Sequence, residues 1–210
     1  MKSTEACDAM VEDLWSQVAT FYESLTPREV NEDFHGHAYD HIRRVVIHCR
    51  HIINLVRDQV DLDQSCLLAA AMCHDLGYGV DSVEHAKISA ELAAPYLERA
   101  RFAPPKTAKI QRMIILHDVR NGVPQTLEER LLFIADRCDS LGFDGTLRMF
   151  MIRGSRIGDR DVIAAKLRPM YKEEMEVMRS FGLRTELIES RWEQSKKLLD
   201  ELRGFIQEKA

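Results

Sequence analysis

The sequence places two polar side chains, His74 and Asp75, at the end of a run of small apolar residues. The run reads LLAAAMC over residues 67–73 and is followed by HDLGYG. A helix this apolar belongs in a core, where an imidazole and a carboxylate are unfavourable unless other groups satisfy them. A local cap, a hydrogen-bond network or a metal ion would each do so. The doublet is therefore the first candidate site for chemistry.

Two more polar residues lie on apolar helical patterns elsewhere in the chain. His41 precedes Val45 by one helical turn and borders an apolar stripe, and Asp136 lies at the end of the apolar segment LLFIAD. Each of these residues alone is more typical of a hydrogen-bonded core residue than of a ligand. Four such residues from three separate helices can meet in a helical bundle, and this combination favours a metal site.

The elements that must position these residues are predicted to be helices. Apolar residues at steps of three and four predict a helix over about residues 38–58. Asp63 or Ser65 would cap the next helix, which ends at His74, and Thr126 with Glu129 has the spacing of a capping box. Further helices are predicted over about residues 5–24, 83–99, 105–117, 127–136, 161–180 and 185–208. No segment has the alternating pattern of a strand, so the predicted fold class is all-α.

Composition and charge narrow the classes of function. A chain of 210 residues with 45% hydrophobic content can bury one substantial core, which predicts a single domain over residues 1–210. The net charge of −5 argues against a binder of nucleic acid polymers. Five scattered cysteines without a CxxC pair, an acidic N-terminal segment and the lack of a membrane-length apolar run predict a cytoplasmic protein without a membrane partner.

Three motifs stand in a recognisable order along the chain. They are DHIRRV with His41, CHDLG with His74 and Asp75, and ADRCDSLG with Asp136. In this order the motifs resemble the H…HD…D signature of the HD-domain metal-dependent phosphohydrolases, over about residues 35–143. The resemblance implies a single-domain helical bundle of the HD-domain type. Its metal-site core would lie at about residues 35–143, with the C-terminal helices packed on it.

The family's larger metal-site variant has two further histidines between the doublet and the final aspartate. His85 in EHAKISAELA and His117 in MIILHDV match these positions. The resemblance therefore implies six ligands. Around one ion it places His41, His74, Asp75 and Asp136. Asp75 would bridge to a second ion, which His85 and His117 hold. Such an imidazole and carboxylate set without thiolate suits one or two divalent ions of Mn, Fe, Co, Ni or Zn.

Several residues near the implied ligands could belong to the substrate site or could lie outside it. Asp118 forms a second doublet with His117, but it opens the polar loop DVRNGVPQ, so we expect it to be solvated or to end a helix outside the site. Basic residues that could hold a phosphate, or simply occupy a solvated helix face, are Arg44, Lys87 and Arg137.

The leaving-group acid is less clearly marked in the sequence. Relatives that cleave mononucleotides carry an acidic residue three positions after the aspartate of the doublet, where this chain has Tyr78. This departure argues against a simple 5′-nucleotidase, and His37 is the remaining candidate acid.

The predicted function is a phosphohydrolase in which metal-activated water attacks phosphorus, with Asp75 as the central ligand. The expected partner is a small phosphorylated substrate, a phosphomonoester or phosphodiester, with a nucleotide as one candidate. Two alternatives stay open: a di-iron oxygenase on the same scaffold, and a regulatory module that binds metal without turnover. The sequence leaves the substrate and the oligomeric state open.

Overall fold

The computed structural model describes residues 2–25, 39–56, 60–182 and 186–207, which form nine α-helices, one short 3₁₀ helix and no strand. This confirms the all-α prediction. The helices are α1 (Lys2–Ser24), α2 (Tyr39–Val56), α3 (Gln64–Cys73), α4 (His85–Arg99), α5 (Pro104–Leu116), η2 (Val119–Asn121), α6 (Leu127–Ser140), α7 (Gly142–Ile157), α8 (Arg160–Ser180) and α9 (Glu186–Gln207).

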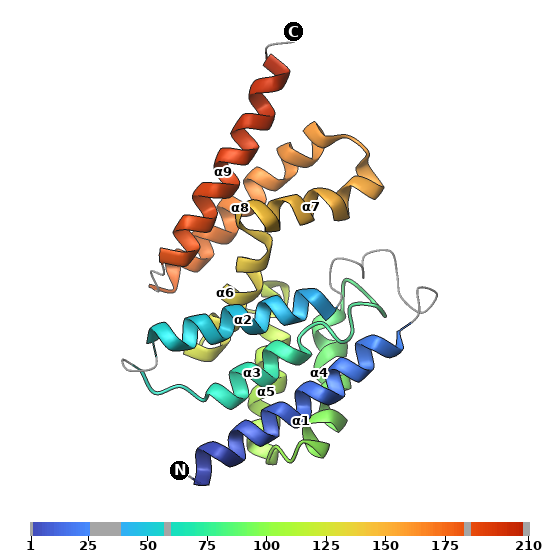
Figure 1. The fold of residues 1–210 in the computed structure, drawn as a ribbon, viewed down its shortest axis with the longest axis vertical. Coiled ribbons are helices and arrows are strands. Elements are labelled where there is room, and N and C mark those ends of the chain that lie inside the picture. The colour runs from blue at the N-terminus through green and yellow to red at the C-terminus, as the bar shows by residue number, and fades with distance from the viewer. Residues whose placement is uncertain (1, 26–38, 57–59, 183–185, 208–210) are drawn as a thin grey trace. The chain divides into compact units, whose positions relative to one another are not determined.

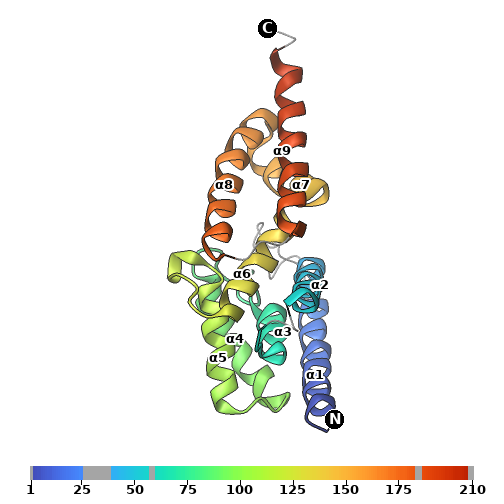
Figure 2. The ribbon, with the colours of Figure 1, turned by 90° about the vertical axis from the view of Figure 1, so that its left-hand side faces the viewer.

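The chain divides into two compact units, residues 1–136 and 137–210, and the division falls within α6. In the first unit α3 packs against α1, α2 and α5, and α4 packs against α5 (Figure 1). In the second unit α7, α8 and α9 pack against one another (Figure 2). The packing of the C-terminal helices on the metal-site core stays a prediction.

Helix α3 is the centre of the first unit because it is apolar on all sides. Eight of its ten residues are buried, including Ala69, Ala70 and Ala71. Short side chains reduce the distance at which neighbouring helices can pack. Helices from several directions can therefore bring side chains close to the end of α3.

The helix caps predicted from the sequence are confirmed. Asp63 is the N-cap of α3 and accepts a hydrogen bond from the Cys66 N–H at 3.2 Å, while Ser65 Oγ donates to the Asp63 carboxylate at 2.8 Å. At the start of α6 the Glu129 N–H donates to Thr126 Oγ1 and the Thr126 N–H donates to the Glu129 carboxylate. These reciprocal bonds form the capping box.

Helix α7 is an element that the sequence patterns do not predict. Three glycines, Gly142, Gly145 and Gly154, lower its intrinsic helix propensity. Gly145 has a packing reason, because a Cβ there would lie 2.5 Å from the carbonyl carbon of Ser140. Packing with α8 and α9 thus outweighs local propensity in this segment.

The described residues also bear on the predicted compartment. No helix in this part of the chain is both long and apolar enough to cross a membrane. The cysteines whose side chains the structure describes are buried and not joined by disulfides: Cys49, Cys66, Cys73 and Cys138. Burial raises the pKa of the Cys73 thiol to about 12, so it offers no thiolate to a metal at neutral pH. The cytoplasmic location stays a prediction.

Gly77 brings the start of α4 against the turn that follows Asp75. A Cβ on Gly77 would lie 2.7 Å from the Cβ of Ile88 and 2.8 Å from the carbonyl oxygen of His85. The Gly77 N–H donates to Ser89 Oγ at 2.8 Å, which fixes the same approach. Only a residue without a side chain fits here without displacing α4.

We expect Gly77→Ala to lower the free energy of unfolding by about 1–3 kcal/mol, because the added methyl group must push α4 away. Urea denaturation of both variants measures the effect. Gly154→Ala is the control, since a Cβ there meets nothing within 4 Å and alanine favours a helix. An unchanged unfolding midpoint in Gly77→Ala would contradict the close approach.

Candidate metal centre

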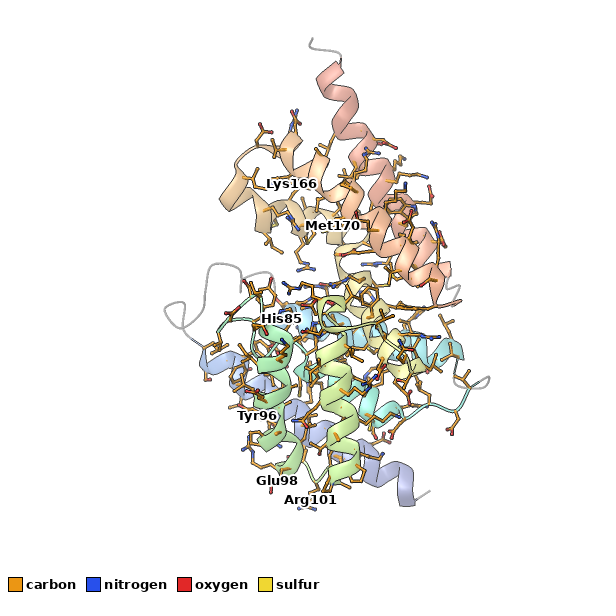
Figure 3. All side chains as sticks on the ribbon, turned by 180° about the vertical axis from the view of Figure 1, so that it is seen from behind. His85, Tyr96, Glu98, Arg101, Lys166 and Met170 are labelled. Carbon is orange, nitrogen blue, oxygen red and sulfur yellow. The ribbon has the colours of Figure 1, made fainter. Side chains whose placement is uncertain are left out.

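The structure brings the six ligands implied by the sequence together from five helices. They are buried, with between 0% and 6% of their surface exposed: His41, His74, Asp75, His85, His117 and Asp136. His74 and His117 are the C-caps of α3 and α5, and His85 is the first residue of α4. Figure 3 shows His85 at one end of α4, with Tyr96 and Glu98 towards the other end. The partial negative charge at the C-terminal ends of α3 and α5 favours a cation beside them.

One group of ligands surrounds one oxygen of Asp75. Asp75 Oδ2 lies 3.4 Å from His41 Nε2 and 3.5 Å from His74 Nε2. Asp136 Oδ1 lies 3.3 Å and 3.7 Å from the same two nitrogens. When ligand atoms bind one ion at about 2.0–2.2 Å, neighbouring ligand atoms lie at distances of this size from each other. These four residues could therefore share one ion.

A second group faces the other oxygen of Asp75. Asp75 Oδ1 lies 3.5 Å from His85 Nε2 and 3.5 Å from His117 Nε2. The two Nε2 atoms are 3.2 Å apart. One oxygen of Asp75 thus faces His41 and His74 and the other faces His85 and His117, which is the arrangement a bridging ligand requires.

The backbone fixes which nitrogen each of these two histidines presents. His85 Nδ1 lies 3.1 Å from the carbonyl oxygen of Ser82, and His117 Nδ1 contacts the carbonyl oxygen of Ile114. A carbonyl oxygen only accepts, so each Nδ1 carries the hydrogen and each neutral imidazole directs a lone pair from Nε2. Oriented Nδ1–H bonds of this kind are the usual support of a metal-ligating histidine.

Two lone pairs that face each other at 3.2 Å repel unless a positive charge lies between them. A proton on His85 is a poor candidate, because burial lowers the pKa of His85 to about 4. A metal ion would satisfy both nitrogens and the nearby Asp75 oxygen together. The residues of this half of the cluster therefore fit a divalent cation.

Ligand chemistry supports the same interpretation for the first group. His74 Nδ1 lies 2.9 Å from the carbonyl oxygen of Ala71, so its Nε2 also faces the cluster as an acceptor. Burial lowers the pKa of His74, but the charges of Asp75 and Asp136 outweigh burial and raise it. The same two carboxylates would attract a metal ion. Two groups of three residues lie close enough together to hold one: His41, His74 and Asp136, and His74, Asp75 and His117.

The basic residues predicted for the site differ in their exposure to solvent and in their partners. Lys87 has 53% of its side chain exposed and pairs with Glu84 at 2.6 Å, and Arg44 is half-buried one turn after His41 on α2. Arg137 belongs to the second unit, where it lies 3.5 Å from Glu174. His37 lies outside the described residues.

The prediction that Asp118 is solvated is wrong, whereas the alternative, a residue at a helix end, agrees with the structure, because Asp118 follows the C-cap of α5 and is the N-cap of η2. Only 5% of its surface is exposed, and its carboxylate accepts hydrogen bonds from the backbone and side chain of Arg120. Sequence reasoning missed Arg120 altogether, because a polar loop gives no signal of which carboxylate will be buried. The one available signal was the short Asp-x-Arg spacing, which lets an N-cap aspartate and an arginine pair locally.

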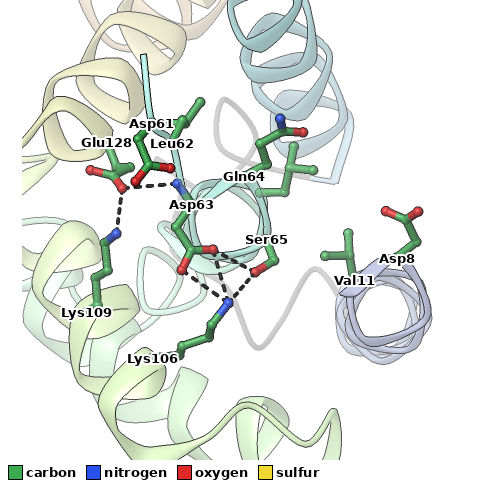
Figure 4. Close-up of a pocket in the computed structure, with 11 residues that line it drawn as sticks. Asp8, Val11, Asp61, Leu62, Asp63, Gln64, Ser65, Lys106, Lys109 and Glu128 are labelled. Atoms are coloured by element: carbon green, nitrogen blue, oxygen red, sulfur yellow. Dashed lines mark hydrogen bonds and ion pairs between the residues drawn. The ribbon is translucent and has the colours of Figure 1, made fainter. Parts of the chain in front are cut away.

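A cavity of about 590 Å³ lies at the N-terminal end of α3, the opposite end of that helix from His74 (Figure 4). Lys106 contacts Asp63 at 3.2 Å and Lys109 contacts Glu128 at 2.5 Å, which ties α5 and α6 to the start of α3. None of the six clustered residues lines this cavity. The candidate metal centre is therefore distinct from it.

Comparisons with known proteins agree with the fold and the cluster. Residues 38–141 match the family model of the HD domain. The crystal structure of Bacillus subtilis YpgQ is similar to this chain with a TM-score of 0.68 and 19% sequence identity, covering 93% of this chain and 97% of YpgQ. YpgQ in complex with ADP gives a TM-score of 0.66 and 20% identity, with 95% and 96% covered.

An HD-superfamily hydrolase from Bacillus thuringiensis is also similar, with a TM-score of 0.65 and 17% identity, covering 96% of this chain and 98% of that protein. No curated protein sequence matches the chain. At these identities the structural likeness establishes the fold. The matched segment contains all six residues of the cluster, and through it the chain belongs to the HD-domain superfamily.

Proposed function

We propose that the protein is a metal-dependent phosphohydrolase that cleaves a small phosphomonoester or phosphodiester, with a nucleotide as the leading candidate. The observation that carries this proposal is the position of the Asp75 carboxylate, whose two oxygens face two different pairs of histidines. HD domains bind divalent metal ions, and the cluster has the donors to hold them. Two ions held by one carboxylate suit phosphoester hydrolysis.

Each residue of the cluster has a definite task in this proposal. His41, His74 and Asp136 would hold one ion with Asp75, and His85 and His117 would hold the second. When bound, such ions acidify water and neutralise charge on phosphoryl oxygens.

The protein groups around the ions orient the donors and set the charge. Carbonyl oxygens of Ala71, Ser82 and Ile114 hold three imidazoles with Nε2 towards the cluster. The two carboxylates of the cluster carry only two negative charges, so two divalent ions would leave the site positive. A net positive site attracts an anionic phosphate.

One similar protein supports a nucleotide as the leading candidate, and one feature of the site limits the kind of nucleotide reaction. The similar protein YpgQ has been solved in complex with ADP. In this chain the Tyr78 ring lies 4.8 Å from the His85 ring. Tyr78 stands where mononucleotide-cleaving relatives have an acid, which argues against a simple 5′-nucleotidase. Arg44 and Lys87 are proposed to contact the phosphate, and His37 is the proposed leaving-group acid.

The first prediction concerns Asp75. We expect Asp75→Ala to lose bound metal and all phosphate release, since both ions depend on this carboxylate, while the helical circular dichroism signal is retained. Metal analysis after purification in Mn²⁺ measures the loss. Asp61→Asn is the control, because Asp61 is exposed and outside the cluster. A variant that kept wild-type metal content would contradict the assignment.

The second prediction concerns the number of ions. His85→Ala or His117→Ala should reduce the metal content from two ions per chain towards one and should sharply lower turnover, because only the second group loses a donor. His51→Ala, an exposed histidine on α2, should change neither quantity. If both site variants kept two ions per chain, a four-ligand mononuclear site would be the better account.

The third prediction separates hydrolysis from oxygen chemistry. A hydrolase uses its ions as Lewis acids, so we expect phosphate release under strictly anaerobic conditions with Zn²⁺ or Mn²⁺ supplied. A di-iron oxygenase needs iron that changes oxidation state, and its turnover stops without oxygen. The proposal fails if a broad panel of phosphoesters gives no phosphate anaerobically while the iron-loaded protein consumes oxygen with an organic substrate.

A further inference from the structure

Asp118, the residue after the implied ligand His117, has a buried carboxylate that holds the side chain of Arg120 in one position. Arg120 Nε lies 3.0 Å from Asp118 Oδ1 and 2.7 Å from Oδ2, and Arg120 Nη2 lies 2.5 Å from Oδ2. The Arg120 N–H also donates to Asp118 Oδ1 at 3.0 Å, because Asp118 caps the helix η2. One carboxylate thus fixes both the backbone and the guanidinium of Arg120.

The neighbours of this pair place it beside the His85 and His117 half of the cluster. Hydrogen bonding to Asp118 raises the pKa of Arg120, and the nearby Tyr78 and Glu84 raise it further. The Tyr78 ring packs 4.8 Å from the His85 ring, and Glu84 is the N-cap of the helix that begins with His85. The guanidinium therefore contacts Asp118, the residue after His117, and lies within electrostatic range of Glu84, the residue before His85.

The guanidinium is oriented on one side and accessible on the other. Its hydrogen bonds among the described residues all go to Asp118 through Nε and Nη2, so the donors of Nη1 are available to a ligand. The side chain of Arg120 is 55% exposed, whereas that of Asp118 is 8% exposed. An arginine fixed in this way loses little conformational freedom when it binds an oxyanion.

We propose that Arg120 binds a phosphate oxygen of the substrate at the His85 and His117 side of the centre, with Asp118 as its positioning residue. This inference rests on the proposed function and adds to it the side chain that recognises the anion. Lys87, the cation expected from the sequence on this side, pairs with Glu84, so Arg120 adds a second phosphate contact to the one proposed for Lys87. A guanidinium suits the task because its planar donors match the geometry of phosphate oxygens.

The test measures anion binding separately from turnover. Isothermal titration calorimetry gives the dissociation constants of inorganic phosphate and of ADP for the metal-loaded protein, and steady-state assays give KM and kcat. We expect Arg120→Ala to raise both the dissociation constants and KM about tenfold or more, with kcat changed less and metal content unchanged. Arg120→Lys and Asp118→Asn should give smaller increases, because the first keeps the charge and the second keeps the guanidinium.

Arg112→Lys is the matched control for Arg120→Lys. Arg112 is also exposed and pairs with a buried carboxylate, Glu129, at 2.7 Å, but it belongs to α5 and lies outside the cluster. We expect this substitution to leave phosphate binding and KM as in the wild type. An equal loss in the Arg112 and Arg120 variants would overturn a specific role for Arg120.

The remaining outcomes separate this inference from the proposed function. If the wild type releases phosphate and Arg120→Ala keeps its KM and dissociation constants, the inference is wrong and the proposed function stands. Loss of metal in Arg120→Ala would also overturn the inference, because it would assign a structural role to the loop. If the wild type releases no phosphate yet Arg120→Ala weakens phosphate binding, the hydrolase proposal fails and the anion contact stands.

Discussion

The buried carboxylate of Asp75 is the constraint on which the rest of the first unit depends. Only 1% of its surface is exposed, and each of its oxygens lies within 3.5 Å of two histidine Nε2 atoms. An ionised carboxylate is costly to bury unless positive charge compensates it, and an imidazole that is kept neutral, as burial keeps His85, supplies none. Cations on both sides would satisfy the carboxylate and the nitrogens together.

The ends of the helices in the first unit position the histidines around the Asp75 carboxylate. His74 and His117 terminate α3 and α5, His85 begins α4, and the backbone carbonyls of the same turns orient the imidazole rings. Gly77 permits α4 to start against the turn after Asp75. A helix end is a suitable position for a ligand because its unpaired carbonyl groups are available to accept from Nδ1.

Local rules explain which parts of the fold and site could be predicted from the sequence. Caps such as Asp63 and Thr126 with Glu129 depend on residues three apart, and apolar periodicity located most helices. The cluster itself was implied by a family resemblance, which carries information about residues far apart in the chain. The six residues do meet, whereas their role as ligands stays a prediction.

The failures have the opposite cause, since each depends on tertiary contacts. Helix α7 contains three glycines that local propensity disfavours, and its packing with α8 and α9 overrides this. Asp118 stands in a polar loop, yet the fold buries it and gives it Arg120 as a partner. The Asp-x-Arg spacing in the loop DVRNGVPQ allows the local pair with Arg120, but the burial of the carboxylate comes from tertiary packing.

The central claim is that Asp75 bridges two metal ions, and anomalous diffraction from crystals of the Mn²⁺-loaded protein tests it most directly. The account predicts two anomalous peaks, one beside each oxygen of the Asp75 carboxylate. One should lie about 2.0–2.3 Å from His41 Nε2, His74 Nε2 and Asp75 Oδ2, and the other at similar distances from His85 Nε2, His117 Nε2 and Asp75 Oδ1. A single peak, or peaks away from Asp75, would contradict the account.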